Sequence, residues 1–274
     1  MDGMAFFDLR RAEAPGRFEM PIVPSLCSGL GTLFGGCGLG ALLEALEHES
    51  GRPTVWATAQ YLDYARPPSV LDIEVNLAVE GRTVTQGRAI GRVDGREILT
   101  VNAALGRRES HLDGQWAVMP EVPPPDDCPP RVVQHRHVGT ILERLDTRLA
   151  DARNPEELPG PPGTGRSALW VRFTGLDMSA GALAIVGDYV PFGVSQASGQ
   201  RAGGNSLDNT IRIANRVPTE WILADIRIHA VHAGFAHGLV HLWAQDGTLL
   251  GTASQSAMVR AWRDEPPAAR TVGR

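Results

Sequence analysis

Asp208 and Gln255 are polar residues in two segments whose other side chains alternate as in half-buried β-strands. Attack of water on a carbonyl group requires a positioned water, a proton acceptor and hydrogen-bond donors for the developing oxyanion. A carboxylate withdrawn from solvent suits the proton acceptor, and an amide, which both donates and accepts, suits orientation of the water. By residue type, Asp208 therefore suits the proton acceptor if it faces inward, and Gln255 suits the orientation of a water molecule.

Gly35 and Gly36 stand where a helix is expected to begin, directly after Phe34. The first amides of a helix lack intrahelical partners and lie at the positive end of its dipole, so they can polarise a carbonyl oxygen. We expect all three residues to bind the substrate. The glycines could instead only let helix and sheet pack closely, just as Asp208 could cap a turn and Gln255 could face solvent.

The elements that must position these residues fall into two similar halves, separated by a Pro-rich stretch at residues 119–130 in which fixed φ angles and missing amides prevent a regular element. In the first half, apolar spacing predicts a helix containing 41–47, and alternation predicts strands at 17–23, 54–65, 70–79, 83–93 and 97–105. The second half repeats this order, with a helix over 191–200 and strands at 165–175, 206–215, 221–231, 236–244 and 248–259. Asp-Gly pairs at 94–95 and 246–247 predict equivalent hairpins.

A helix followed by a long antiparallel meander is best buried when a curved sheet wraps around it, which is the α+β arrangement of the hotdog fold. We predict a double hotdog, with two such units joined edge to edge into one continuous antiparallel sheet, because this pairing hides an exposed edge strand of each unit. The expected boundaries are an N-terminal hotdog at 1–118, a linker at 119–134, a C-terminal hotdog at 135–262 and a disordered tail at 263–274.

An ordered set of landmarks resembles the acyl-CoA thioesterase II, or TesB-like, family of double hotdog hydrolases. The landmarks are Leu33-Phe34-Gly35-Gly36, the stretch 61–67, Ser206-Leu207-Asp208-Asn209, Glu220-Trp221, Gln245-Asp246-Gly247 and Ala253-Ser254-Gln255. The resemblance covers roughly residues 17–261. It implies hydrolysis of a fatty acyl-CoA, of medium or long chain, or of a related acyl thioester, to the free acid and CoA.

In that family an aspartate, a hydroxyl-bearing residue and a glutamine hold the attacking water. The resemblance assigns the aspartate to Asp208 and the glutamine to Gln255, and it places the hydroxyl near His229 and His232, where the sequence has no Ser or Thr. Either an imidazole takes over part of the role or turnover is weak, and both histidines could also be ordinary strand residues. A non-catalytic acyl-CoA or acyl-carrier binding protein is therefore the alternative function.

The repeat aligns Thr58 with Asp208 and Ala103 with Gln255, so the polar pair occurs in only one of the two halves. We expect one active site per chain. We also expect Thr58, in the half without the pair, to contribute to substrate binding.

Other chemistries fit the sequence less well. Residues 193–197 come close to a nucleophile elbow, but the predicted strands follow one another without intervening helices. Residues 36–41 formally fit a dinucleotide fingerprint without a βαβ unit. The pairs His135-x-His137 and His237-x3-His241 lack a further ligand at a recognised spacing, so no metal is expected. A hydratase of this fold would carry His five residues after the aspartate, where Ile213 stands.

Composition limits the partners. The net charge is -5, without a basic cluster, and this argues against nucleic acid. No stretch approaches the roughly 20 apolar residues of a membrane span, and the first residues do not form a signal peptide. The 3 cysteines contain no CxxC pair, which argues against a disulfide framework. We expect a cytoplasmic homo-oligomer that acts on an acyl thioester and uses no cofactor.

Overall fold

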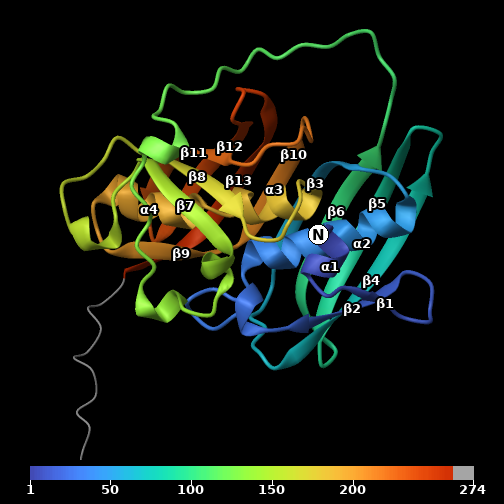
Figure 1. Cartoon of the computed structure of the whole chain (residues 1–274). Helices are drawn as coiled ribbons and strands as arrows, with labels where there is room; N and C mark the ends of the chain where they lie inside the picture. Colours follow the sequence, from blue (N-terminus) through green and yellow to red (C-terminus); the bar gives the residue numbers. More distant parts are fainter. Residues whose placement is uncertain (262–274) are drawn as a thin grey trace, which may run out of the picture.

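The computed structural model describes residues 1–261, so the predicted tail at 263–274 lies outside the described residues. One antiparallel sheet of 13 strands wraps around the helices (Figure 1). The strand order is β1-β2-β4-β5-β6-β3-β10-β13-β12-β11-β8-β7, and β9 pairs with β13 outside this path. The predicted double hotdog with one continuous sheet is therefore confirmed.

The elements have the following bounds. The first half contains α1 (Gly3–Phe6), β1 (Arg10–Arg11), β2 (Arg17–Ile22), α2 (Gly35–Ser50), β3 (Thr54–Tyr61), β4 (Ser69–Glu80), β5 (Val84–Val93) and β6 (Arg96–Gly106). The second half contains β7 (Leu145–Asp151), β8 (Arg166–Phe173), α3 (Ala180–Gly187), α4 (Val190–Ser198), β9 (Ala202–Ser206), β10 (Asp208–Ile213), β11 (Ile222–His232), β12 (Phe235–Ala244) and β13 (Leu249–Ala261). Short 3-10 turns lie at Pro24–Leu26, Pro125–Asp127, His135–His137, Ile141–Arg144 and Pro155–Glu157.

The two halves meet at β3 and β10, which pair in the middle of the sheet from Asp208–Gln60 to Arg212–Trp56. On either side of this seam the strands follow in equivalent order, β6-β5-β4-β2 in one direction and β13-β12-β11-β8 in the other. The seam turns the edge of each half into the centre of a larger sheet, which removes two unpaired edges. The internal repeat in the sequence thus corresponds to an approximate twofold relation in space.

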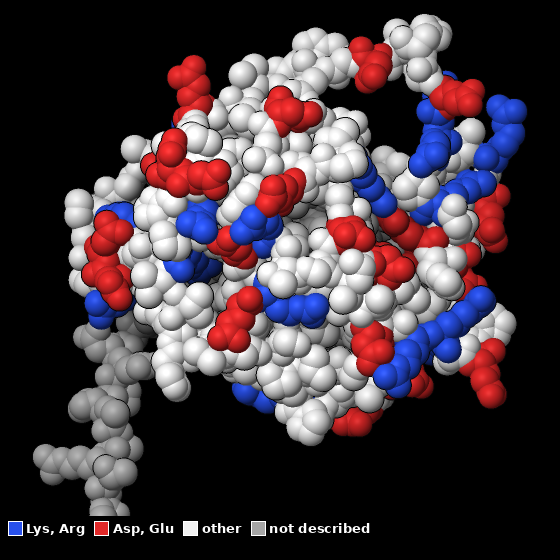
Figure 2. Space-filling view, in the orientation of Figure 1, with Lys and Arg blue, Asp and Glu red and all other residues white. Residues whose placement is uncertain are grey.

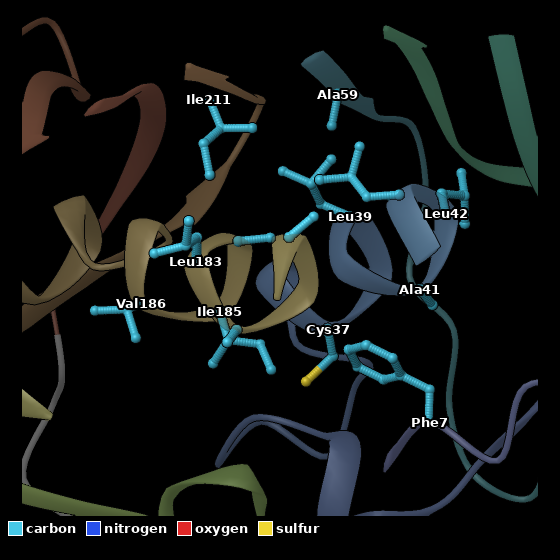
Figure 3. Packing of buried hydrophobic residues seen from close by; sticks show 14 of the residues in the cluster. Phe7, Cys37, Leu39, Ala41, Leu42, Ala59, Leu183, Ile185, Val186 and Ile211 are labelled. Carbon is cyan, nitrogen blue, oxygen red and sulfur yellow. The ribbon is translucent and has the colours of Figure 1, made fainter. Parts of the chain in front are cut away.

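The helices of the two halves differ. The first half has one long helix, α2, whereas the second half has α3 and α4 separated by Asp188 and Tyr189. Sequence patterning predicts α4 but not α3, because all eight residues of α3 are buried and no polar face marks its period. Leu39 of α2 and Leu183 of α3 lie on the same side of their helices, beneath Ala59 and Ile211 of the central strands (Figure 3).

Small residues let α2 and α3 approach closely. A Cβ at Gly40 of α2 would lie 3.1 Å from the Gly181 Cα and 2.9 Å from the Phe7 ring. Phe7, which follows α1, also packs against Gly181 itself. Beside it, Gly3 of α1 lies against the Glu44 carboxylate. The N-terminal residues therefore cover one end of the α2–α3 pair.

The segment between the halves covers the outer face of the second half of the sheet (Figure 1). A second, smaller core on that face consists of Cys128, Ala168, Trp170, Trp221, Leu223 and Trp243, against which Ala117, Met119 and Val122 pack. The Trp170 indole donates a hydrogen bond to the Pro123 carbonyl at 2.9 Å. The Pro-rich linker is therefore a packed part of the fold.

We expect Gly40→Ala to lower the free energy of unfolding by about 1–3 kcal/mol, the usual cost of overpacking, because the added methyl meets the Gly181 backbone. Gly38→Ala in the same helix is the matched control. Its methyl meets only the ends of the Leu33 and Leu99 side chains, and the helix propensity of Ala offsets the contact. Urea denaturation of both variants tests the difference, and equal losses would contradict the proposed close approach.

Candidate active site

A cavity of about 500 Å³ lies where the start of α2 meets the break between α3 and α4. Gly35 and Tyr61 of the first half line it together with Asp188 and Tyr189 of the second half. Residues of the segment 131–137, which follows the Pro-rich stretch at 119–130, form a further wall. The cavity therefore depends on the joining of the two halves.

Asp188 is the buried carboxylate in the cavity wall, with only 5% of its surface exposed. Its Oδ2 accepts a hydrogen bond from the Gly36 amide at 2.6 Å. Its Oδ1 accepts from the Ser206 hydroxyl at 3.2 Å and from the Gln255 amide. The Gln255 Nε2 also donates to the Ser206 Oγ at 3.0 Å, and the Val190 amide donates to the Gln255 Oε1 at 3.1 Å. We call these groups the Asp188 cluster.

Burial raises the pKa of Asp188 to about 6. The hydrogen bonds from Gln255, Gly36 and Ser206 stabilise the charged form and oppose this rise. A carboxyl group with this pKa is mostly ionised at neutral pH, yet it can hold a proton transiently. It therefore meets the requirement for a general base that later returns its proton.

Tyr61 lies beside this carboxylate. A Cβ at Gly35 would lie 2.8 Å from the Asp188 Oδ2 and 3.2 Å from the Tyr61 hydroxyl oxygen. Burial raises the pKa of Tyr61 well above its ordinary value, and the charges of Asp188 and Asp208 add to this effect. Tyr61 therefore presents a neutral hydroxyl next to Asp188, with the fully buried Asn209 side chain nearby.

The structure does not bring Asp208 and Gln255 together. Successive residues of a strand face opposite sides of the sheet, and Asn209 and Ile211 face inward with no exposed surface. Asp208 therefore faces outward, where its Oδ1 accepts a hydrogen bond from the Ser256 amide at 2.8 Å. Gln255 faces inward and is 3% exposed. This corrects the expected pairing, because the carboxylate beside Gln255 belongs to Asp188.

The other residues predicted from the sequence also divide between the cavity and the outer face of the sheet. Phe34 and Gly35 line the cavity, and the Gly36 amide is bonded to Asp188. Thr58 faces the outer side, where its hydroxyl lies 2.7 Å from that of Thr210 and where it shares a separate hollow with Asp208. The expectation that Thr58 contacts substrate in the same site as Gly35 is corrected for this reason.

His229 and His232 are both exposed near the end of β11, and neither lines the cavity or the outer hollow. All four residues at 229–232 are exposed, in contrast to the buried start of β11. The expected imidazole contribution to the site is therefore corrected as well.

Sequence patterning overlooks Asp188 and Ser206. Ser206 belongs to the same landmark as Asp208 but ends β9, so its hydroxyl reaches the cavity. Asp188 stands at the end of the apolar run 180–187, directly before α4. A single carboxylate that interrupts an otherwise apolar helical stretch is the signal that could have identified it.

Among residues 1–261, no group of three or more His, Cys, Asp or Glu side chains is arranged to hold a metal ion. Within the same residues, no helix has the length and apolar character needed to cross a membrane.

Comparisons with known proteins show the family of this chain. Residues 125–259 match the family profile of the acyl-CoA thioesterase C-terminal domain. A structure from Novosphingobium aromaticivorans assigned as a thioesterase shares 34% identity, with a TM-score of 0.81, over 92% of this chain and 98% of that one. The chain belongs to the TesB-like acyl-CoA thioesterase family. This thioesterase is thus a thioester hydrolase.

More distant structures share the fold. A TesB protein of Mycobacterium avium subspecies paratuberculosis is 19% identical, with a TM-score of 0.77 over 94% of this chain and 98% of that one. TesB2 of Mycobacterium marinum, an acyl-CoA thioesterase II, is also 19% identical, with a TM-score of 0.74 over 95% and 98% of the two chains. No curated protein sequence matches the thioesterase.

The raised pKa of Asp188 predicts a specific dependence of stability on pH. The folded state holds the Asp188 proton more tightly than the unfolded state, whose carboxyl has a pKa near 3.8. The stabilisation from this proton is complete below about pH 4 and is lost as the pH rises through about 6. Asp188→Asn cannot ionise, so relative to wild type the variant should gain about 3 kcal/mol of stability from well below pH 4 to well above pH 6, of which about 2 kcal/mol develops between pH 4.5 and pH 7.5. Urea unfolding of both proteins at pH 4.5 and pH 7.5 measures this difference, and parallel pH dependences would contradict it.

Proposed function

We propose that this thioesterase hydrolyses fatty acyl-CoA thioesters in the cavity, with Asp188 as the general base. The buried Asp188 carboxylate, fixed by Gly36, Ser206 and Gln255 in the cavity wall, carries this proposal. The raised pKa of Asp188 supports it, because a carboxylate with an ordinary pKa accepts a proton less readily.

In the proposed reaction a water molecule lies against Asp188 and is oriented by Ser206 or Gln255. Asp188 takes one proton from the water, and the water oxygen forms a bond to the thioester carbon. The carbonyl oxygen becomes an oxyanion, and the C–S bond then breaks to give the acid. The CoA thiolate leaves and receives the proton that Asp188 had taken. The carboxylate is thereby restored, and no cofactor is needed.

The start of α2 is the proposed oxyanion site. Gly35 lines the cavity and is the first residue of α2, so its amide has no intrahelical partner. The carbonyl oxygen would approach this amide at the positive end of the α2 dipole. The neighbouring Gly36 amide is already occupied by Asp188. The two glycines thus take different roles, one toward the substrate and one toward the base.

The three groups of the family mechanism are all present in the Asp188 cluster. Asp188 supplies the carboxylate, Ser206 the hydroxyl and Gln255 the amide. Ser206 supplies the hydroxyl for which the sequence around His229 and His232 offers no candidate. The sequence argument for a non-catalytic binding protein loses its main support here.

The apolar part of the cavity suits an acyl chain. Leu33, Phe34, Leu99, Ile141 and Leu142 line it, and these side chains offer no competing hydrogen bonds. Burial of each methylene of the acyl chain contributes about 0.8 kcal/mol to binding at most. A homo-oligomer and a cytoplasmic location remain predictions from the sequence.

We expect Asp188→Asn to lower kcat about 10²- to 10⁴-fold, because the amide cannot accept a proton from water. Ser206→Ala and Gln255→Ala should lower it less, since they remove orientation and leave the base. Asp208→Asn, which makes the same change on the outer face, is the matched control and should keep kcat close to that of wild type. Thiol release from short-, medium- and long-chain acyl-CoA esters measures all four variants. Loss of activity in Asp208→Asn with full activity in Asp188→Asn would reverse the assignment of the base.

A further inference from the structure

We infer that Arg131 binds an anionic group of the substrate inside the cavity. The ligand is an oxyanion, either a phosphate of the CoA nucleotide or a carboxylate carried by the acyl group. This inference deepens the proposed function, because it takes the cavity as the substrate site.

Arg131 is held in place by aromatic side chains. Its guanidinium lies 4.8 Å from the centroid of the Phe192 ring and 5.9 Å from that of Tyr189. The Arg131 amide donates to the Thr147 carbonyl at 2.9 Å, which fixes the backbone to β7. Both aromatic residues line the cavity together with Arg131. Stacking orients the guanidinium plane and leaves its edges available for hydrogen bonds.

Most of the N–H donors of Arg131 are not used within the described part of the chain. Its side chain forms no ion pair with another residue between 1 and 261, and it donates a hydrogen bond to the Tyr189 hydroxyl, which occupies one of its five N–H donors. Arg153, on the same cavity, donates to the Pro161 and Gln196 carbonyls. Arginine with free donors in a partly desolvated wall is a receptor for carboxylate or phosphate.

Several arginines elsewhere on the surface have acidic partners. Arg92 pairs with Glu74 and Glu97, and Arg172 pairs with Asp146. Figure 2 shows basic and acidic groups interleaved over the face that it presents. Unlike these arginines, Arg131 has no carboxylate partner among residues 1–261.

The neighbouring charges favour an anion. Burial, followed by the positive charges of Arg131 and Arg136, lowers the pKa of His137 to about 4, so this imidazole is neutral. Of the carboxylates lining the cavity, Asp63 is paired with Arg96 at 2.8 Å and Asp188 is held by its own donors. Glu156 is exposed at the rim. Positive potential around Arg131 is thus left for the substrate to neutralise.

An acyl thioester can supply the anion from two places. The pantetheine arm and a plain alkyl chain carry no charge, so neither can satisfy Arg131. The phosphates of CoA lie at the far end of the pantetheine arm, and a carboxylate can lie at the far end of the acyl chain. Both accept the same pair of parallel N–H hydrogen bonds.

Arg131→Met tests the inference with three substrates. They are an acyl-CoA, the same acyl group on pantetheine, and a pantetheine thioester whose acyl chain ends in a carboxylate. If Arg131 binds CoA phosphate, the KM for acyl-CoA should rise about 10- to 100-fold while that for plain acyl-pantetheine is unchanged. If it binds an acyl carboxylate, the rise should occur with the carboxyacyl thioester instead.

Arg212→Met is the matched control, because it removes one exposed arginine from the outer face of β10. An equal rise in KM for all three substrates, or no rise beyond that of Arg212→Met, would overturn the inference. Arg131→Lys keeps the charge but loses the planar fork, so it should give a smaller rise with the same substrate and serves if Arg131→Met does not fold.

Calorimetric binding of CoA and of pantetheine to the wild type and Arg131→Met gives a readout without turnover. CoA carries the phosphates and pantetheine does not, and neither is hydrolysed, so the difference in their binding reports the contribution of the phosphates alone. This measurement does not depend on the identity of the base. If Asp188→Asn remained active, the proposed function would fail while the binding comparison still tested Arg131.

Discussion

The site depends on hydrogen bonds between two carboxylates and the starts of two helices. Asp188, directly after α3, accepts from the Gly36 amide at the start of α2, and Glu44 of α2 accepts from the Gly181 amide at the start of α3 at 3.0 Å. Each carboxylate is buried and has a raised pKa, and each gains from an unpaired amide and the positive end of a helix dipole. These two contacts hold α2 and α3 antiparallel and set the position of Asp188 relative to the cavity.

Because each carboxylate is bonded to a helix of the other half, one half alone could not form the site. Asp188 and Gly36 are 152 residues apart, and Tyr61 and Gln255 also come from different halves. The seam between β3 and β10 brings them within reach, since it fixes the register of the halves. The packed linker adds a second constraint by tying the outer face of the sheet to Trp170 and its neighbours.

Much of the fold could be predicted from the sequence because strand alternation and hairpin turns are local signals. Asp246-Gly247 and the repeated order of strands are sufficient to suggest two hotdogs. The site could not be predicted in the same way. Whether Asp208 faces inward depends on the register at which β10 pairs with β3, which a short strand does not reveal. The carboxylate that ends the apolar run 180–187 could mark Asp188 as unusual, but its role depends on an amide 152 residues away, which no local pattern reveals.

The N-terminal residues cover Glu44 in one half, so the equivalent positions in the two halves differ in their access to the cavity. Glu44 and Asp188 occupy related positions, yet Gly3 and Phe7 close off the first while the second opens on the cavity. In a dimer of identical subunits, every substitution is made twice, and closing one site closes both. A fused chain encodes its two halves independently. Glu44 can therefore serve to hold the helices together, while natural selection acts separately on Asp188 for catalysis.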